Sequence, residues 1–108
     1  MSSGFELSRS AELLRVCNRI PAGRVASYGS VGRQMGVSGL VAGKWLDNWG
    51  DQTCWWRVVG SKGDLLTARR DAGLAMIQRA LLESEGVDFD SQGRVMATFF
   101  VDLDSLIG

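Results

Sequence analysis

The sequence predicts a small α/β domain, mainly helical, that contains a winged helix-turn-helix. The chain has 108 residues, of which 45% are hydrophobic and 22% are charged. These values fit one globular domain over residues 1–108 and exclude a disordered tail. Two short helical patterns joined by a glycine-containing turn lie within 28–48 and outline a helix-turn-helix. Two strand-like segments around a turn follow within 56–67, where a wing is expected.

Charge and cysteine content narrow the class of protein. Twelve Lys and Arg residues balance twelve Asp and Glu residues. This balance argues against binding nucleic acid through a positive field over the whole surface, but it leaves room for a local basic face. No apolar run approaches the roughly 20 residues of a membrane span, and no signal peptide is apparent. We therefore expect no membrane partner and two free cysteine thiols in a reducing cytoplasm.

The sequence contains no histidine. This absence removes the commonest general base, the usual activator of a catalytic cysteine or serine, and the commonest metal ligand. Because two cysteines are also too few for a zinc site, we expect neither a metal nor another cofactor.

The first helix is predicted over 8–20. Apolar residues recur there at helical spacing, with arginines on the other side. The only proline of the chain, Pro21, ends the pattern. Cys17 lies on or beside the apolar stripe, and we interpret it as a small core residue.

The helix-turn-helix is predicted from two shorter segments. The first helix spans 28–35, where Val31 and Met35 are four residues apart. The second spans 40–48 and follows the turn 37–39. A wing hairpin is then expected from strands 56–59 and 64–67 on either side of the turn 60–63.

The last predicted helix spans 71–85, and Asp71 suits its N-terminal turn. Its apolar stripe consists of Leu74, Ile77, Leu81 and Leu82. Two further segments, 87–89 and 94–100, are expected either to pair as a hairpin or to pack in extended form.

All four tryptophans lie within twelve residues, at Trp45, Trp49, Trp55 and Trp56. Two interpretations are open. The rings can form a local aromatic core, or they can line a pocket for a flat ligand, because aromatic rings stack on planar groups.

Three motifs resemble one protein family in order and spacing. Residues 20–31 read IPAGRVASYGSV, residues 54–63 read CWWRVVGSKG, and residues 81–87 read LLESEGV. They are similar to the I-P-x-G-x-V-x-T/S-Y-G, P-C-H-R-V-V/I-x-x-x-G and L-L-x-x-E-G-V motifs in the DNA-binding domain of the O6-alkylguanine-DNA alkyltransferases. The resemblance covers about 20–95 and implies the winged helix-turn-helix of the C-terminal domain of those enzymes.

Tryptophans replace the reactive pair of that family. In the enzymes a cysteine accepts the alkyl group and the next residue, a histidine, activates it. Trp55 and Trp56 occupy these positions, and an indole is not a nucleophile for this transfer. Tryptophan at the acceptor position is typical of the alkyltransferase-like proteins. Membership of that group implies a noncatalytic monomer.

The function that this resemblance implies is recognition of DNA damage without repair. A protein of this kind binds double-stranded DNA containing O6-alkylguanine through the minor groove and flips the nucleotide out. It then presents the lesion to nucleotide excision repair proteins.

Cys54 provides a less favoured alternative, an active alkyltransferase. The residue lies one position before the acceptor position. No histidine exists to take its proton, and neighbouring side chains in an extended segment point to opposite faces. We therefore interpret Cys54 as structural.

The resemblance also implies roles for individual residues. Tyr28 matches the tyrosine that crowds the phosphate beside the lesion and helps to rotate the nucleotide out. Trp55, with Trp56 beside it, would line the alkyl pocket. Ser61 and Lys62 match the wing that closes over the flipped base.

Two further matches are expected to be internal. Arg57 follows the acceptor pair, and we expect it to order the loop more than to contact DNA. Glu85 matches the glutamate that ends the acid–base relay of the enzymes. Because that relay has no other members here, we expect Glu85 to be structural.

The recognition helix departs from the family pattern. The family places an arginine there that fills the gap left by the flipped base. The stretch 37–46 is two residues shorter, and Leu40 or Val41 is the nearest replacement. An apolar wedge can hold an opened base stack. Phosphate contacts are then expected from Arg24, Arg33, Lys44 and Lys62.

The missing arginine also supports a second alternative from a different class. The chain would then be a protein-interaction module that has kept the fold and lost tight DNA binding.

Overall fold

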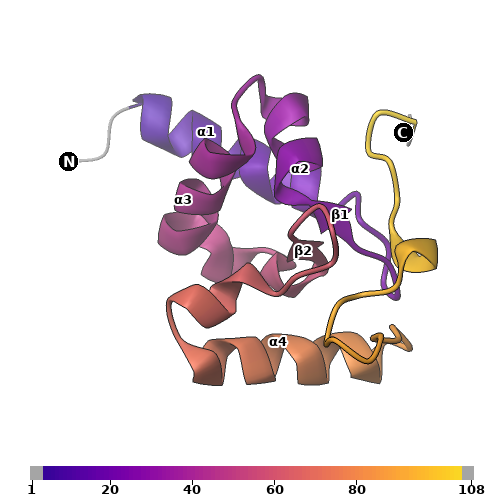
Figure 1. Ribbon diagram of the computed structural model, residues 1–108. Coiled ribbons are helices and arrows are strands. Elements are labelled where there is room, and N and C mark those ends of the chain that lie inside the picture. Colours follow the sequence, from indigo (N-terminus) through magenta and orange to yellow (C-terminus); the bar gives the residue numbers. More distant parts are fainter. Residues whose placement is uncertain (1–3, 106–108) are drawn as a thin grey trace.

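The computed structural model describes residues 4–105, with side chains from Ser8 onward. Within this range four α-helices surround a two-stranded sheet (Figure 1). In chain order the elements are α1 (Gly4–Cys17), β1 (Ala26–Ser27), α2 (Tyr28–Met35), α3 (Gly39–Trp49), β2 (Val58–Val59) and α4 (Ala72–Ser84). Four short 3-10 helices lie between and after them: η1 (Gly50–Gln52), η2 (Trp55–Arg57), η3 (Leu66–Arg69) and η4 (Ala97–Phe99).

The predicted helix-turn-helix is confirmed as α2 and α3, and local capping explains its boundaries. The Ser27 hydroxyl accepts a hydrogen bond from the Ser30 amide at 3.0 Å and starts α2. Gly36 ends α2 with a φ of 73°, a left-handed conformation that favours glycine. The Ser38 hydroxyl accepts from the Val41 amide at 3.2 Å and starts α3.

The sheet joins two distant segments and separates two core clusters. β1 pairs with β2 in parallel, with Ala26 opposite Val58 and Ser27 opposite Val59. Side chains alternate between the faces of a strand. Ala26 and Val58 accordingly belong to the cluster formed with α1, α2 and α3, whereas Val59 belongs to the cluster beneath α4.

The wing was expected to be a hairpin of strands 56–59 and 64–67, and this prediction is wrong. Only Val58–Val59 is a strand, and it pairs with β1 because this arrangement buries both valines completely. The next residues form a closed loop in which the Gly60 amide donates to the Asp64 carbonyl at 2.8 Å. The chain then enters η3 where the second strand was expected. The loop 60–64 therefore occupies the place of a wing without a second strand.

The predicted bounds of two helices need correction. α1 was expected over 8–20 but begins at Gly4 and ends at Cys17, so a turn separates it from Pro21. α4 was expected over 71–85 and spans Ala72–Ser84, with the Asp71 carboxylate capping its start.

The buried face of α4 also differs from the expected apolar stripe. Ile77 is 54% exposed, whereas the neighbouring Gln78 is completely buried. The Gln78 amide accepts from the Thr67 hydroxyl at 2.7 Å and donates to the Val58 carbonyl at 3.0 Å. A buried amide that is fully hydrogen-bonded can take the place of an apolar residue, and here it ties α4 to the sheet and to η3.

The C-terminal segment runs along the sheet side of the molecule and includes the short helix η4 (Figure 1). Phe89 forms an antiparallel bridge with Val95, and Val25 forms a parallel bridge with Phe100. Leu103 inserts completely into the cluster formed with α1 and α2. Within the described residues, no helix combines the length and apolar character needed to cross a membrane.

Candidate nucleic-acid interface

Two adjoining hollows lie between α3 and the segment around η3. The helix-start hollow measures about 520 Å³ and is lined by Tyr28, Gly39, Leu40, Gly43, Lys44, Asp47, Leu66, Thr67, Arg69 and Arg70. The tryptophan hollow measures about 210 Å³ and is lined by Tyr28, Leu46, Asp47, Gly50, Asp51, Trp55, Thr67, Arg70 and Leu74. Because four residues line both, the two hollows form one continuous depression along α3.

Tyr28 lies where the two hollows meet. It is the first residue of α2, directly after β1, so the sheet and the Ser27 cap fix its backbone. α3 crosses its ring at Gly43, where a β-carbon would lie 3.7 Å from Tyr28 Cδ1. Burial, together with the nearby Asp47 carboxylate, raises the pKa of the Tyr28 hydroxyl. The hydroxyl therefore stays protonated and can donate a hydrogen bond.

Leu40 projects into solvent from the first turn of α3. Its exposed fraction is 76%, the largest value given for any large apolar side chain among the described residues. Lys44 follows four residues later, which places both side chains on one face of the helix, and both line the helix-start hollow. An exposed leucine at the start of a helix matches the expected position of an apolar wedge.

An ion pair that the sequence did not indicate spans the depression. Asp47 on α3 and Arg70 at the end of η3 approach to 2.9 Å, and both side chains are about half exposed. Arg69 lines the helix-start hollow beside them. These residues belong to no recognisable pattern, because only the tertiary fold brings α3 and η3 together.

The tryptophan cluster divides into core and site residues. Trp45 and Trp49 pack against each other with ring centroids 5.6 Å apart and join the core cluster of α1 to α3. Trp55 lines the tryptophan hollow with Tyr28 and meets the Trp56 ring edge-on at 6.3 Å. Trp45 and Trp49 therefore agree with the aromatic-core interpretation, and the pocket interpretation is left to Trp55, which lines a hollow.

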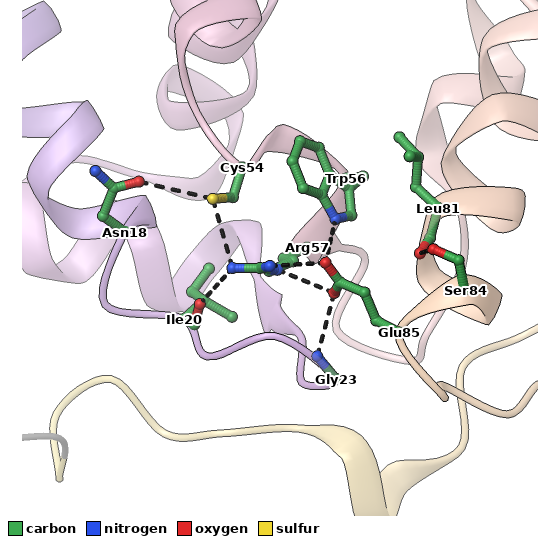
Figure 2. A network of polar contacts seen from close by, with 9 residues as sticks. All are labelled: Asn18, Ile20, Gly23, Cys54, Trp56, Arg57, Leu81, Ser84 and Glu85. Carbon is green, nitrogen blue, oxygen red and sulfur yellow. Dashed lines mark hydrogen bonds and ion pairs between the residues drawn. The ribbon is translucent and has the colours of Figure 1, made fainter.

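Trp56 and Arg57 line neither hollow. Both side chains point toward Glu85, as Figure 2 shows. The Arg57 Nε donates to Glu85 Oε1 at 3.0 Å, and Nη2 donates to Oε2 at 2.7 Å. The Trp56 indole donates to Oε2 at 3.1 Å, and the Gly23 amide donates to Oε1 at 3.1 Å. Arg57 Nη1 also reaches the Ile20 carbonyl at 3.0 Å. The expected internal roles of Arg57 and Glu85 agree with this geometry.

The network sets the charge state of Glu85. Burial acts to raise the pKa of its carboxyl, but the hydrogen bonds from Arg57, Gly23 and Trp56 outweigh burial and lower the pKa below its ordinary value. The carboxylate therefore stays ionised and paired near neutral pH.

Neither cysteine lines the two hollows. Cys54 Sγ donates to Asn18 Oδ1 at 3.6 Å and accepts from Arg57 Nη1 at 3.5 Å (Figure 2). Cys17 is completely buried, and burial raises the pKa of its thiol to about 12. In the part of the chain that the structure describes, no group of His, Cys, Asp and Glu residues is arranged to hold a metal ion.

Six of the expected site residues lie outside the depression: Trp56 and Arg57, described above, and four more. Ser61 and Lys62 line a separate C-terminal hollow of about 470 Å³ with Arg94, Met96 and Phe100 among its walls. Arg24 donates to the Thr98 carbonyl at 3.0 Å. Arg33 approaches Asp104 at 3.5 Å and remains largely exposed. The fold thus brings together Tyr28, Leu40, Lys44 and Trp55, but not the other six expected site residues.

Comparison with known proteins places this geometry in a family. The family model described as 6-O-methylguanine DNA methyltransferase, DNA binding domain, matches residues 9–87. The chain belongs to this family. The match includes Tyr28, the Trp55–Trp56 pair and Glu85.

The chain is similar to one protein described as base-flipping and to two solved structures of DNA complexes. The chain is 31% identical over 88 residues to a DNA base-flipping protein of Vibrio parahaemolyticus, across 78% of this chain and 85% of the relative. The crystal structure of S. pombe Atl1 in complex with damaged DNA containing O6-carboxymethylguanine matches with a TM-score of 0.72 at 24% identity, covering 94% of this chain and 98% of that one. A structure of S. pombe ATL in complex with DNA matches with a TM-score of 0.69 at 24% identity, covering 92% and 94%. These structural matches confirm the predicted fold.

Proposed function

We propose that this chain recognises O6-alkylguanine in double-stranded DNA by nucleotide flipping and transfers no alkyl group. The observation that carries this proposal is the shared lining of the tryptophan hollow by Tyr28 and Trp55. A flat indole stands where an acceptor side chain would be needed, beside the tyrosine that would rotate the nucleotide. The hollow can receive a base but offers it no thiol as alkyl acceptor.

The surroundings of the hollow suit a flipping mechanism. Extruding a base costs a few kcal/mol of stacking and pairing, and the cost is least at a damaged pair. Leu40 would enter the gap in the stack from the start of α3, and Lys44 on the same face would contact a phosphate. Trp55 would stack on the extruded base.

The position of Cys54 argues against the enzymatic alternative. Its thiol contacts Asn18 and Arg57 and does not line the tryptophan hollow. The sequence offers no histidine to activate it. A base seated against Trp55 would therefore not meet the sulfur.

The relatives support the same function. The Vibrio parahaemolyticus protein is described as base-flipping, and S. pombe Atl1 was crystallised with DNA containing O6-carboxymethylguanine. A protein that binds a lesion without repairing it needs other proteins to remove the damage. We therefore also propose that this chain acts as a cytoplasmic monomer that presents the lesion to nucleotide excision repair proteins.

One observation favours the protein-interaction module as a second candidate. Met76 and Ile77 on the outer side of α4 are 73% and 54% exposed. Exposed apolar side chains of this size can mark a protein contact. An interaction through α4 would leave the depression beside α3 without a function.

Tryptophan fluorescence titration tests the proposal directly. Matched duplexes with and without one O6-methylguanine are added to the protein, and Trp55 reports insertion of a base. Tighter binding of the modified duplex with a change in tryptophan emission is expected. Equal affinity for both duplexes would contradict lesion recognition, and weak binding of both would favour the interaction module.

Intact-mass spectrometry after prolonged incubation tests the absence of catalysis. We expect no mass gain of one methyl group. A gain that maps to Cys54 would show the chain to be an active alkyltransferase.

A further inference from the structure

The tryptophan hollow combines aromatic walls with surplus negative charge. Its charged lining residues are Asp47, Asp51 and Arg70. Arg70 pairs with Asp47 at 2.9 Å. In the part of the chain that the structure describes, no lysine or arginine lies within ion-pair distance of Asp51. One carboxylate is thus left without a counter-charge beside the Trp55 and Tyr28 rings.

Each hollow has charged lining residues that the other lacks. Lys44 and Arg69 line only the helix-start hollow, whereas Asp51 lines only the tryptophan hollow. The phosphate backbone needs cations, and these lie toward the start of α3. The tryptophan hollow, which would receive the base, carries the negative charge of Asp51. This charge would be unfavourable for a phosphate.

Alkylated bases differ in charge, and the positively charged ones would complement the carboxylate in the tryptophan hollow. An alkyl group on O6 of guanine leaves a neutral base. An alkyl group on a ring nitrogen such as N1 of adenine leaves a base with a positive charge spread over the ring. Aromatic faces attract cations, tryptophan most strongly, and a nearby carboxylate adds to the attraction.

We infer that the tryptophan hollow binds positively charged, ring-nitrogen-alkylated bases more tightly than neutral alkylated bases. This inference rests on the proposed function, because it assumes that the hollow receives a flipped base. Asp51 is the residue that determines the preference, and Trp55 supplies the aromatic face. Both Asp47 and Asp51 are exposed, so solvent screens the charge and the preference is a matter of a few-fold.

The test uses fluorescence titration at one salt concentration to compare four duplexes that differ only at the base pair that carries the test base. One carries 1-methyladenine, which is cationic, and one carries 1-methylguanine, which is neutral. Both bases are methylated at N1 on the pairing edge, so both lose Watson–Crick pairing, which lowers the cost of flipping in each duplex. The third duplex carries O6-methylguanine, and the fourth is unmodified.

The expected result is that the wild-type chain binds the 1-methyladenine duplex about 2- to 5-fold more tightly than the 1-methylguanine duplex, the scale of a solvent-exposed cation–π contact. Asp51→Asn brings this ratio close to one. The control Asp88→Asn removes an exposed carboxylate that lines neither hollow. It therefore corrects for weaker repulsion of DNA in general and leaves the ratio unchanged.

Two outcomes contradict the inference, and a third contradicts both the inference and the proposed function. A wild-type ratio of one or less, or a ratio that Asp51→Asn does not lower, contradicts a charge-based preference. In either case tighter binding of the O6-methylguanine duplex than of the unmodified duplex leaves the proposed function standing. If no modified duplex binds more tightly than the unmodified one, the proposed function fails as well.

Discussion

Arg57 and Glu85, which are 28 positions apart in sequence, form a two-point ion pair with contacts of 3.0 and 2.7 Å. Their side chains are only 14% and 15% exposed. The pair joins the segment after the two site tryptophans to the end of α4, and the Trp56 indole shares the same carboxylate. The part of the chain that carries Trp55 is therefore anchored by α4 through Glu85.

Removing one member of this pair is expected to destabilise the fold strongly. Arg57→Ala leaves the Glu85 carboxylate largely buried without its cation, and breaking a buried pair in this way costs about 3 kcal/mol or more. Chemical denaturation at neutral pH measures the loss. The matched control is Glu83→Ala, which breaks an exposed pair with Arg79. This control should lose less than about 1 kcal/mol, and similar losses in both variants would contradict a structural role for the Arg57 pair.

Glu85 also predicts how stability depends on pH. Its pKa is lower in the folded chain than the ordinary value of 4.5, so the unfolded state binds the proton more readily. The stability contributed by Glu85 is fully present above the unfolded pKa and is lost as the pH falls below about 4.5 and through the lower folded value. Glu85→Gln should remove this part of the acid-induced loss. Denaturation curves across acidic pH measure it, and parallel profiles for the two proteins would show that Glu85 does not contribute.

Tyr28 is expected to contribute to lesion binding through its ring. Tyr28→Ala should weaken binding to the O6-methylguanine duplex by roughly 1–3 kcal/mol, the scale of one stacking contact. Tyr28→Phe keeps the ring that packs beneath Gly43 and isolates the part played by the hydroxyl. Fluorescence titration measures both variants. Unchanged affinity of the alanine variant would remove Tyr28 from the flipping step.

Leu40 is expected to act as a wedge in the base stack. Leu40→Ala should weaken binding to the lesion specifically, because the gap loses its filler. Leu40→Arg should strengthen binding to damaged and undamaged duplex alike, because it adds a charge close to the DNA. The exposure of Leu40 makes both substitutions safe for the fold. If titrations of both variants match the wild type, α3 does not enter the groove.

The scattered basic residues predict a modest dependence of binding on salt. Each phosphate neutralised contributes roughly −0.9 to the slope of log affinity against log salt concentration. The four expected cations would give a slope of about −3.6 by the same rule, nearer −3 than −8. Arg24 and Arg33 lie outside the depression, which favours a value no steeper than this. A slope near −8, on the same scale, would reveal basic contacts other than the four proposed.

Local signals predicted the helices well. The serines before α2 and α3, the glycine after α2 and the aspartate before α4 act through neighbouring backbone groups, so their effect can be read from short stretches of sequence. The parallel pairing of β1 with β2 could not be read in this way. A short β-branched segment indicates a strand but does not identify its partner, and the expected hairpin was wrong for that reason.

The site was predictable where motifs mark it and not where the fold assembles it. Tyr28 and Trp55 lie in recognisable segments, and they do share a hollow. Asp47, Arg70 and Asp51 meet there only because η3 packs across from α3. Gln78 was missed because a polar residue in an apolar stretch is ordinarily expected on the surface, and its burial depends on partners in η3 and β2.

The short parallel sheet fixes the distance between Tyr28 and Trp55, whatever the length of the chain between them. Tyr28 directly follows β1, and η2, which begins at Trp55, directly precedes β2. Residues 29–54 therefore form a loop closed at its base by the sheet, and the cost of closing a loop changes only slowly with its length. Insertions or deletions in this loop can reshape α3 while the sheet keeps the backbones of Tyr28 and Trp55 in place. Under the proposed function, duplex binding through α3 and base recognition through Tyr28 and Trp55 can thus diverge separately among homologues.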